Sequence, residues 1–258
     1  MNQNYLKVVV AAMAVVLLTS VSARASETDD RIESSAKQSY VFKTYLKDDA
    51  IRTQSRDGVV TLTGTVTEES HRSLAKETVA SLPGVKSVDN QLELKGERPA
   101  ENSDGWISMQ VKTSLLFNRN VSGIKTKVFV TDGIVTLKGE AESQAQKDLA
   151  GEYARDVKGV KDVKNEMTIA KVSSESKKTA NEKIDDASIT AQVKMAFLSH
   201  HSTSAFKTGV ETNNGVVTLS GNAINAAAKD MATKVASDVN GVKEVVNNMT
   251  IEDSLSKN

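Results

Sequence analysis

The sequence of 258 residues contains no cysteine. This absence excludes disulfide bonds, thiolate metal ligands and cysteine nucleophiles, and it also excludes lipid attachment through a cysteine near the N-terminus. Aromatic residues make up only 4% of the chain, too few for a platform on which nucleic-acid bases could stack. Lysine and arginine number 33, as do aspartate and glutamate, so the chain has no overall positive field. We therefore expect no nucleic acid among its partners.

Long hydrophobic runs are also scarce. The main candidate, residues 8–18, has 11 residues, well short of the roughly 20 that span a bilayer. Lys7 precedes this run and a small-residue stretch ending in Ala25 follows it, a pattern typical of a secretory signal. We expect residues 1–25 to be a signal peptide cleaved near Ala25, with an uncleaved anchor as the alternative. The exported chain would hold 31 basic and 33 acidic residues, a net charge of −2.

An internal repeat organises the rest of the chain. Three glycines and an asparagine recur with gaps of 6, 20 and 6 residues, and successive repeats lie 75 and then 82 residues apart. A period this long, with polar segments between the copies, predicts separate small domains rather than a solenoid. The repeated residues are Gly58, Gly64, Gly84 and Asn90, then Gly133, Gly139, Gly159 and Asn165, then Gly215, Gly221, Gly241 and Asn247.

Each repeat predicts the same order of elements. An amphipathic helix comes first, as the spacing of Ile107, Val111 and Leu115 shows. A tight-turn dipeptide such as Asp132-Gly133 then joins two strands of alternating polarity, and a second helix and a last strand follow. We expect an α+β fold of three tandem αββαβ domains, each with two helices packed on one face of a three-stranded mixed sheet. The predicted domains cover residues 30–97, 104–171 and 185–253.

Finer details of the elements can also be predicted. Ser143 with Gln146 forms a capping-box pattern at the start of the second helix of the middle repeat, and Thr67 and Asn225 are the expected N-caps of its counterparts. The last strand should alternate, so that residues such as Ile169 share its buried face. Residues 97–103 and 172–183 are short and polar, and we expect mobile linkers that let the domains engage a surface together.

The repeated motif resembles a known family. Gly-x-Val-x-Leu-x-Gly, a helix and then Gly-Val-x-x-Val-x-Asn is similar to the BON domain of bacterial osmotically inducible periplasmic proteins. The resemblance covers nearly all of the three predicted domains. It implies a periplasmic location, an affinity for phospholipid or envelope surfaces, and a role in osmotic or envelope stress. Relatives of this kind often carry two copies or a lipid anchor, whereas this chain has three copies and no cysteine.

Two basic positions recur in all three repeats. One lies early in the second helix and the other directly follows the third glycine. Ordinary surface charge is one interpretation, and a weak contact with anionic phosphates, worth ~1 kcal/mol per lysine, is the other. Acidic neighbours such as Asp162 and Glu244 would partly offset that attraction. The candidate headgroup contacts are Arg72, Lys147 and Lys229 in the helix, and Lys86, Lys161 and Lys243 after the glycine.

Other polar and aromatic residues have a structural and a functional interpretation. The recurring asparagines share a face with apolar residues, so their amides should be hydrogen-bonded, either to the nearby glycine loop or to a ligand. The glycines should serve turns and helix ends. Trp106 either packs against its own domain and linker or marks an interface with a membrane or protein.

Catalysis finds little support in the sequence. His71, His200 and His201 do not recur between repeats and fit surface positions, and adjacent histidines alone do not make a specific metal site. No nucleophile elbow, phosphate loop or HExxH motif is present. We expect no catalytic residues, no metal and no cofactor. The predicted function is that of a non-enzymatic periplasmic protein that reversibly binds phospholipid or envelope surfaces. The alternative is a protein-binding or chaperone-like module that uses its sheet edges.

Overall fold

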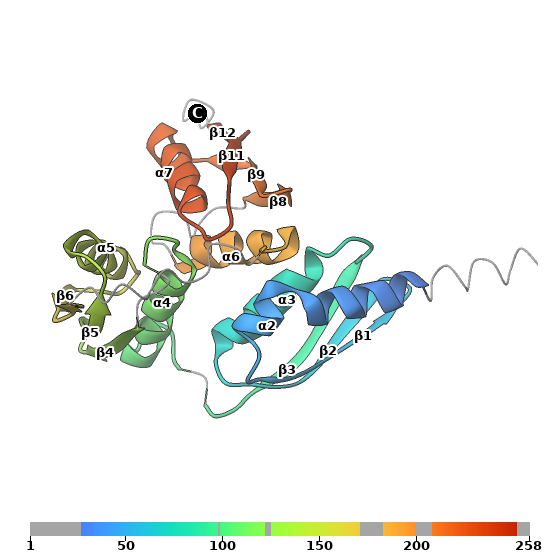
Figure 1. Ribbon diagram of the computed structural model, residues 1–258, viewed down its shortest axis with the longest axis horizontal. Coiled ribbons are helices and arrows are strands. Elements are labelled where there is room, and N and C mark those ends of the chain that lie inside the picture. Colours follow the sequence, from blue (N-terminus) through green and yellow to red (C-terminus); the bar gives the residue numbers. More distant parts are fainter. Residues whose placement is uncertain (1–26, 98, 122–124, 171–182, 200–207, 252–258) are drawn as a thin grey trace, which may run out of the picture.

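The computed structural model describes residues 27–97, 99–121, 125–170, 183–199 and 208–251. Three α/β units follow one another along the chain (Figure 1). The predicted signal peptide, its cleavage site at Ala25, most of the second linker and His200-His201 lie outside the described residues. None of the described helices is long and apolar enough to cross a bilayer.

The first domain has the predicted order of elements. Its hairpin is antiparallel, and its last strand runs parallel to the middle strand in the order β1-β2-β3. Its first helix is broken at Ser39, whose hydroxyl accepts a hydrogen bond from the Phe42 N–H and so begins a new helical turn. The elements are a helix over residues 27–38, α2 (Tyr40–Thr44), β1 (Ala50–Arg56), β2 (Val59–Val66), α3 (Glu69–Ala80) and β3 (Ser87–Leu94).

The second and third domains repeat this architecture. Their sheets have the orders β4-β5-β6 and β11-β9-β8, again with an antiparallel hairpin and a parallel third strand. The second domain contains α4 (Asp104–Phe117), β4 (Lys125–Thr131), β5 (Ile134–Ala141), α5 (Gln144–Arg155), β6 (Asp162–Asn165) and β7 (Thr168–Ile169). The third contains α6 (Asp186–Ser199), β8 (Gly209–Asn213), β9 (Val216–Ser220), β10 (Asn222–Ala223), α7 (Ala226–Ser237), β11 (Glu244–Asn247) and β12 (Thr250–Ile251).

The last strand differs from the prediction in two domains. It is continuous in the first domain but divided into β6 and β7 in the second and into β11 and β12 in the third. In all three domains the asparagine side chain accepts the N–H of the residue two positions later, Leu92, Met167 or Met249, so this bond alone does not divide the strand. Beyond the break, Ile169 and Ile251 are each 47% exposed, so the expectation that Ile169 lies on the buried face is wrong.

Two of the three predicted N-cap residues are confirmed. The Ser143 hydroxyl accepts from the Gln146 N–H at 3.2 Å, and Asn225 accepts from the Ala228 N–H at 2.8 Å, as predicted. The prediction for Thr67 is wrong. Glu68 precedes α3 without a side-chain cap, because the Thr67 backbone N–H and hydroxyl both donate to Asp49, at 2.8 and 3.0 Å.

Each domain has its own core between the helices and one face of the sheet. The alternating Val and Leu of the middle strand are fully buried in all three copies, for example Val135 and Leu137. Small helix residues such as Ala75, Ala150 and Ala232 are buried against the sheet and bring the second helix close to it. The other face of each sheet is left without a helix, so it presents its side chains outward.

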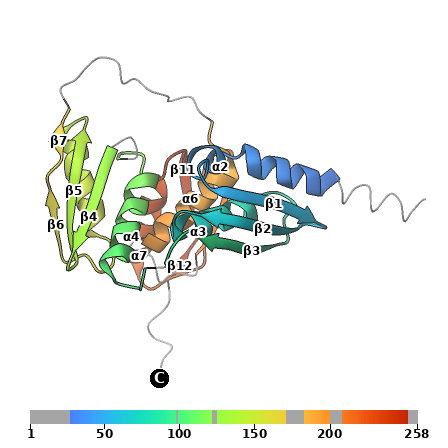
Figure 2. The same cartoon turned by 90° about the horizontal axis from the view of Figure 1, so that it is seen from below.

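Helix α6 joins the three domains into one assembly. Ten of its 14 residues are buried, far more than a one-sided surface helix allows. Ile189, Val193 and Phe197 pack in the third domain's core, whereas Ala191 and Met195 belong to the core of the first domain. Helix α4 of the second domain also packs on α6, and the views show α6 between the other two domains (Figures 1 and 2). The three described domains therefore pack together through α6 and are not joined by their linkers alone.

Polar contacts complete the junction between the first and third domains. The Asp185 carboxylate accepts from the Ser188 N–H at 2.9 Å at the start of α6 and from the Tyr40 N–H at 2.8 Å at the start of α2. The Lys194 ammonium lies 3.0 Å from the Glu77 carboxylate. One carboxylate thus satisfies two helix N-termini from different domains.

The second and third domains meet through backbone hydrogen bonds. The Arg119 N–H donates to the Asp238 carbonyl at 2.7 Å, and the Asn240 N–H donates to the Phe117 carbonyl at 3.1 Å. The Arg119 guanidinium also donates to backbone carbonyls at the end of α7 and in the following glycine loop. Burial, together with a hydrogen bond to Asp238, raises the pKa of Tyr153 to about 12. The phenol therefore stays protonated and donates across the junction at neutral pH.

A charge on the first-domain side of α6 should separate the domains. Ala191→Glu would bury an unpaired carboxylate, which costs several kcal/mol unless the interface opens. We expect a larger radius of gyration by small-angle X-ray scattering and a separate unfolding transition for the first domain. Leu198→Glu is the matched control, because Leu198 is exposed on the same helix and the change should shift stability by less than about 0.5 kcal/mol. An unchanged radius of gyration in Ala191→Glu would contradict the junction.

Candidate functional site at the hairpin corners

The same corner closes one end of every domain. There the first helix begins, the hairpin turns and the loop after the second helix passes by. A carboxylate near the start of the first helix accepts both backbone N–H groups of the turn dipeptide. The three sets are Asp29 with Asp57 and Gly58 (2.7 and 2.9 Å), Asp104 with Asp132 and Gly133 (2.8 and 2.9 Å), and Asp186 with Asn214 and Gly215 (2.7 and 2.9 Å).

The turn requires its glycine. Asp132 and Gly133 both have positive φ, 53° and 80°, which matches the tight turn expected of this dipeptide. A side chain on Gly133 would also lie 3.2 Å from the Gly159 carbonyl oxygen. Ile107 of the first helix fills the space beside Gly159, so the turn glycine, the loop glycine and the helix pack as one unit.

The recurring lysine after the third glycine is part of this corner. The backbone N–H of each donates to the carbonyl of the hairpin glycine, and its aliphatic stem lies over that glycine. The hydrogen bonds are Lys86 to Gly58 (2.8 Å), Lys161 to Gly133 (2.9 Å) and Lys243 to Gly215 (2.8 Å). All three side chains are exposed. The backbone and stem are fixed, while the ammonium remains within reach of solvent.

The carboxylate of the first corner has a perturbed pKa. A hydrogen bond from the Ser55 hydroxyl, at 2.6 Å, contributes most to lowering the pKa of Asp29, and the Gly58 and Asp57 N–H groups and the Lys86 charge lower it further. These donors all favour the ionised carboxylate. The corner is therefore held by a charged acceptor at neutral pH.

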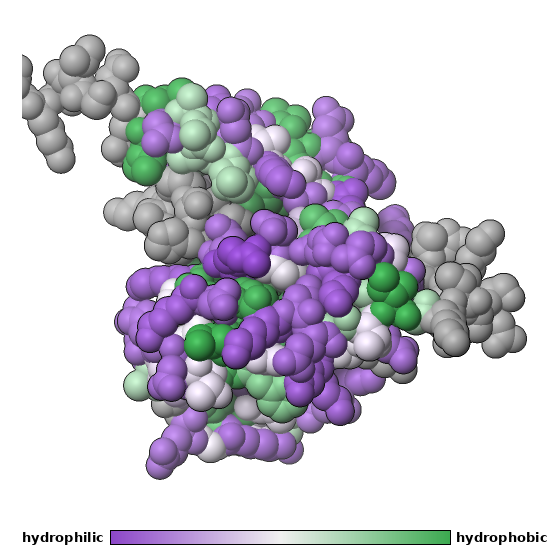
Figure 3. Space-filling model, turned by 90° about the vertical axis from the view of Figure 1, so that its left-hand side faces the viewer, coloured by the Kyte–Doolittle hydropathy of each residue, from purple (hydrophilic) through white to green (hydrophobic). Residues whose placement is uncertain are grey.

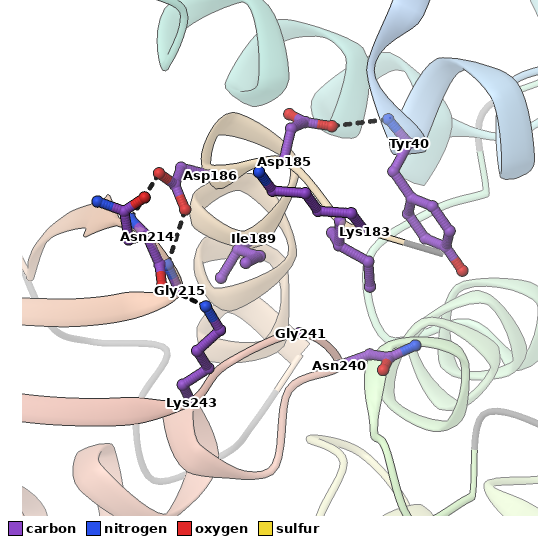
Figure 4. Close-up of a pocket in the computed structure, with 11 residues that line it drawn as sticks. Tyr40, Lys183, Asp185, Asp186, Ile189, Asn214, Gly215, Asn240, Gly241 and Lys243 are labelled. Atoms are coloured by element: carbon purple, nitrogen blue, oxygen red, sulfur yellow. Dashed lines mark hydrogen bonds between the residues drawn. The ribbon is translucent and has the colours of Figure 1, made fainter. Parts of the chain in front are cut away.

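A cavity opens at the corner of the third domain. It has a volume of about 540 Å³ and is lined by Asp186, Asn214 and Lys243, with Lys183 and Asn240 nearby (Figure 4). Tyr40 of the first domain contributes to its wall, so the cavity borders the junction between the first and third domains. The Lys243 ammonium donates to the Asn214 carbonyl at 2.9 Å, and Asp185 and Asp186 also line the cavity.

A sequence profile of the BON domain matches residues 28–96, 103–171 and 185–253. The chain belongs to the BON domain family. The corner described above is therefore a feature that recurs in all three BON domains of this chain, and the predicted family resemblance is confirmed.

Three relatives have similar sequences to parts of this BON protein. Osmotically-inducible protein Y of Escherichia coli is 32% identical over 143 residues, which cover 54% of this chain and 71% of the relative. The 21 kDa hemolysin of Actinobacillus pleuropneumoniae is 32% identical over 146 residues, 55% of this chain and 74% of the relative. Outer membrane lipoprotein DolP of Haemophilus influenzae is 32% identical over 159 residues, 59% of this chain and 80% of the relative.

The two sets of basic candidates lie at opposite ends of the second helix in each BON domain. Arg72 is in the first turn of α3, whereas Lys86 follows its end, and a 12-residue helix is about 18 Å long. The helix set is also less available. Arg72 lies 3.7 Å from Glu69, and the half-buried Lys229 donates to the Met249 carbonyl at 2.6 Å. The structure thus separates the six candidates into an exposed corner set and a half-buried helix set, the latter Arg72, Lys147 and Lys229.

The recurring asparagines tie the last strand to the second helix. The amide N–H₂ groups of Asn90, Asn165 and Asn247 donate to the carbonyls of Arg72, Lys147 and Lys229, at 3.0, 2.6 and 2.9 Å. The structural interpretation is right in kind but wrong in partner, because the amide binds the helix and not the glycine loop. A buried polar group on the apolar face is satisfied in this way.

The remaining candidates also find structural partners. Trp106 packs half-buried against the core of the second domain and lines a cavity with Pro99, as the packing interpretation predicts. The His71 Nδ1 atom lies 2.6 Å from Asp49, which is almost fully buried. No cluster of three metal-ligating side chains occurs among the residues that the structure describes.

The corner aspartates were missed by the sequence analysis. Each lies 29 residues before its turn glycine, so the same spacing argument that found the glycines could have found Asp29, Asp104 and Asp186. Asp185 and Arg119, which connect domains, have no repeated counterpart and leave no such signal.

Neutralising the first corner should change the pH dependence of stability. The pKa of Asp29 in the folded protein lies below its usual value of 3.8. The ionised carboxylate therefore contributes fully to the free energy of unfolding above pH 3.8, and this contribution is lost as the pH falls through the lower pKa of the folded state. We expect Asp29→Asn to be less stable at pH 7 and to lose less stability than the wild type between pH 4 and pH 2.

The matched control is Asp30→Asn, which removes the same charge from the exposed neighbouring residue. Thermal unfolding followed by circular dichroism across this pH range checks the prediction. Equal pH dependence in Asp29→Asn and in the wild type would show that the corner carboxylate contributes nothing.

Proposed function

We propose that this BON protein is exported to the periplasm and works there by reversible contact with anionic phospholipid headgroups. Membership of the BON family supports a role in the envelope or in osmotic stress. The relatives of this chain include an osmotically inducible protein and an outer membrane lipoprotein. The observation that carries the proposal is the exposed lysine at the same corner of each domain. Its backbone is fixed by the hairpin, and its ammonium remains accessible.

The energetics fit a reversible contact. Each lysine near an anionic surface contributes about 1 kcal/mol, so the corner set alone corresponds to weak binding. The packed domains hold these lysines in a fixed arrangement, so their combined effect depends on how many reach one surface at once. Arg72, Lys147 and Lys229 should contribute less, because they are half-buried and two of them already have partners.

One polar cluster in the first domain has a structural role rather than the geometry of a proton relay. Thr67, His71 and Asp49 form a cluster that superficially resembles a catalytic triad. However, the Thr67 hydroxyl and the Asp49 carboxylate both face the same ring nitrogen, Nδ1, at 3.3 and 2.6 Å. A relay needs the hydroxyl at one nitrogen and the carboxylate at the other. The cluster therefore serves as a tie between the β1 strand and α3.

A protein-binding function is the second candidate. Ile224 and Ile251 are 63% and 47% exposed. Ile224 directly follows Ala223, which pairs with Ile251 at the end of the third domain. An exposed apolar pair of this kind suits a weak protein contact. Binding of an unfolded exported protein that does not depend on lipid, and that is lost in Ile224→Ser, would favour this function over the first.

Co-sedimentation with vesicles tests the lipid proposal. The exported chain from Ser26 should sediment with vesicles of phosphatidylglycerol and phosphatidylcholine, but not with phosphatidylcholine alone, and higher salt should weaken the binding. The triple variant Lys86→Gln/Lys161→Gln/Lys243→Gln should bind vesicles at least about 10-fold more weakly. The upper limit of the loss is about 3 kcal/mol of attraction, or roughly 150-fold in affinity. The wild type failing to sediment with either vesicle at low salt would refute the proposed function.

A further inference from the structure

The open face of the middle sheet differs from the rest of the surface. The helices of the second domain cover the other face, and Lys127, Phe129, Lys138 and Lys164 project outward from β4, β5 and β6. Phe129 is 52% exposed, and the Lys138 ammonium lies 6.0 Å from the centre of its ring. We call these four residues the middle-sheet face. On this side of the molecule the surface is mainly hydrophilic, with apolar residues exposed in small separate patches (Figure 3).

The pairing of strands places like charges together. Lys127 lies directly opposite Lys138 on the neighbouring strand, an arrangement that destabilises a sheet. Phe129 and Lys164 flank Thr136 on its two sides, so the lysines surround the ring. Among the described residues, only Lys138 in this group lies within ion-pair distance of a carboxylate, that of Glu166 at 3.2 Å. The Lys127–Lys138 pairing itself therefore does not help the domain to fold, although Lys138 also contacts Phe129 and Glu166.

The acidic residues of this sheet lie toward its margins. Glu140 lies at the end of β5, opposite Lys125, and Asp162 begins β6. The Asp162 carboxylate also accepts the Val163 N–H of its own strand at 2.8 Å. The three lysines of the face are thus matched in number by Glu140, Asp162 and Glu166, and Lys127 and Lys138 are the charges nearest the exposed ring in the strand register.

The other two domains provide an internal comparison. At the same positions relative to the turn glycine and the recurring asparagine, the first domain has Arg52, Gln54, Thr63 and Asp89, and the third has Gly209, Glu211, Ser220 and Val246. Neither combines an exposed aromatic ring with three lysines. The BON fold does not require the middle-sheet face, so its residues are free to serve binding.

We propose that the middle-sheet face is the principal surface with which this protein meets an anionic phospholipid bilayer. An exposed aromatic ring suits the boundary between headgroups and acyl chains, and lysines around it contact the phosphates. A broad sheet surface matches the flatness of a bilayer better than the cavity at the third corner does. This inference rests on the proposed function and adds a larger contact surface to the corner lysines.

The test compares two triple variants with the same change of charge. Lys127→Gln/Lys138→Gln/Lys164→Gln removes the charge of the face, and Lys37→Gln/Lys47→Gln/Lys76→Gln removes three exposed lysines of the first domain. With vesicles containing phosphatidylglycerol, we expect about 30-fold weaker binding for the face variant and at most a 3-fold loss for the control. Circular dichroism confirms that both variants fold.

A fluorescence measurement gives an independent readout. Phe129→Trp in a Trp106→Phe background leaves one tryptophan, on the face. Its emission should shift to shorter wavelength with phosphatidylglycerol vesicles and stay unchanged with phosphatidylcholine. If the wild type sediments but the face variant binds as well as the control, or the emission does not shift, the inference fails while the proposed function stands. A wild type that binds neither vesicle refutes both.

Discussion

The burial of α6 between three domains is the constraint on which the assembly depends. A helix with one apolar stripe needs one partner, but α6 must contact its own sheet, the first domain and α4 of the second. Small residues allow this close approach, and its buried polar groups are hydrogen-bonded both within the helix and across the junction, where Ser188 accepts the Val41 N–H at 3.1 Å. Gln192 is fully buried, yet its amide donates to the Ser188 carbonyl at 3.1 Å. The helix therefore fixes the positions of all three domains.

The repeats have kept the residues that close each domain and have changed those that face outward. A carboxylate bound to two turn amides and an asparagine bound to a helix carbonyl both satisfy backbone groups that would otherwise be buried or unpaired, so they recur in every copy. The outer positions of the sheets carry no such obligation. Most of them differ between copies, from Phe129 to Gln54 and Glu211, although Thr136 recurs as Thr61 and Thr218. Differences in binding among the three domains should therefore lie on these faces.

The sequence allowed the local fold to be predicted because its signals are local. Glycine spacing and alternating Val and Leu set the hairpins, and Ser143 and Asn225 cap helices as expected. The burial of α6 could not be predicted in this way, because alanine, serine and threonine on a second face suit solvent and a close interface equally. The basic candidates show a similar limit. Equivalent positions in a repeat do not imply one surface, and the structure places Arg72 and Lys86 at opposite ends of a helix.

A rigid arrangement changes how weak contacts add up. Domains on flexible linkers could each turn toward a membrane, whereas domains locked by α6 present whichever faces their packing allows. The chain as a whole is nearly neutral, so attraction to an anionic surface must come from local concentrations of charge rather than from a global field. Lys127 and Lys138, held side by side by the strand register, form such a concentration without any rearrangement of the protein. On the proposal above, an anionic surface that paired with both lysines would offset their mutual repulsion, so binding would stabilise this sheet.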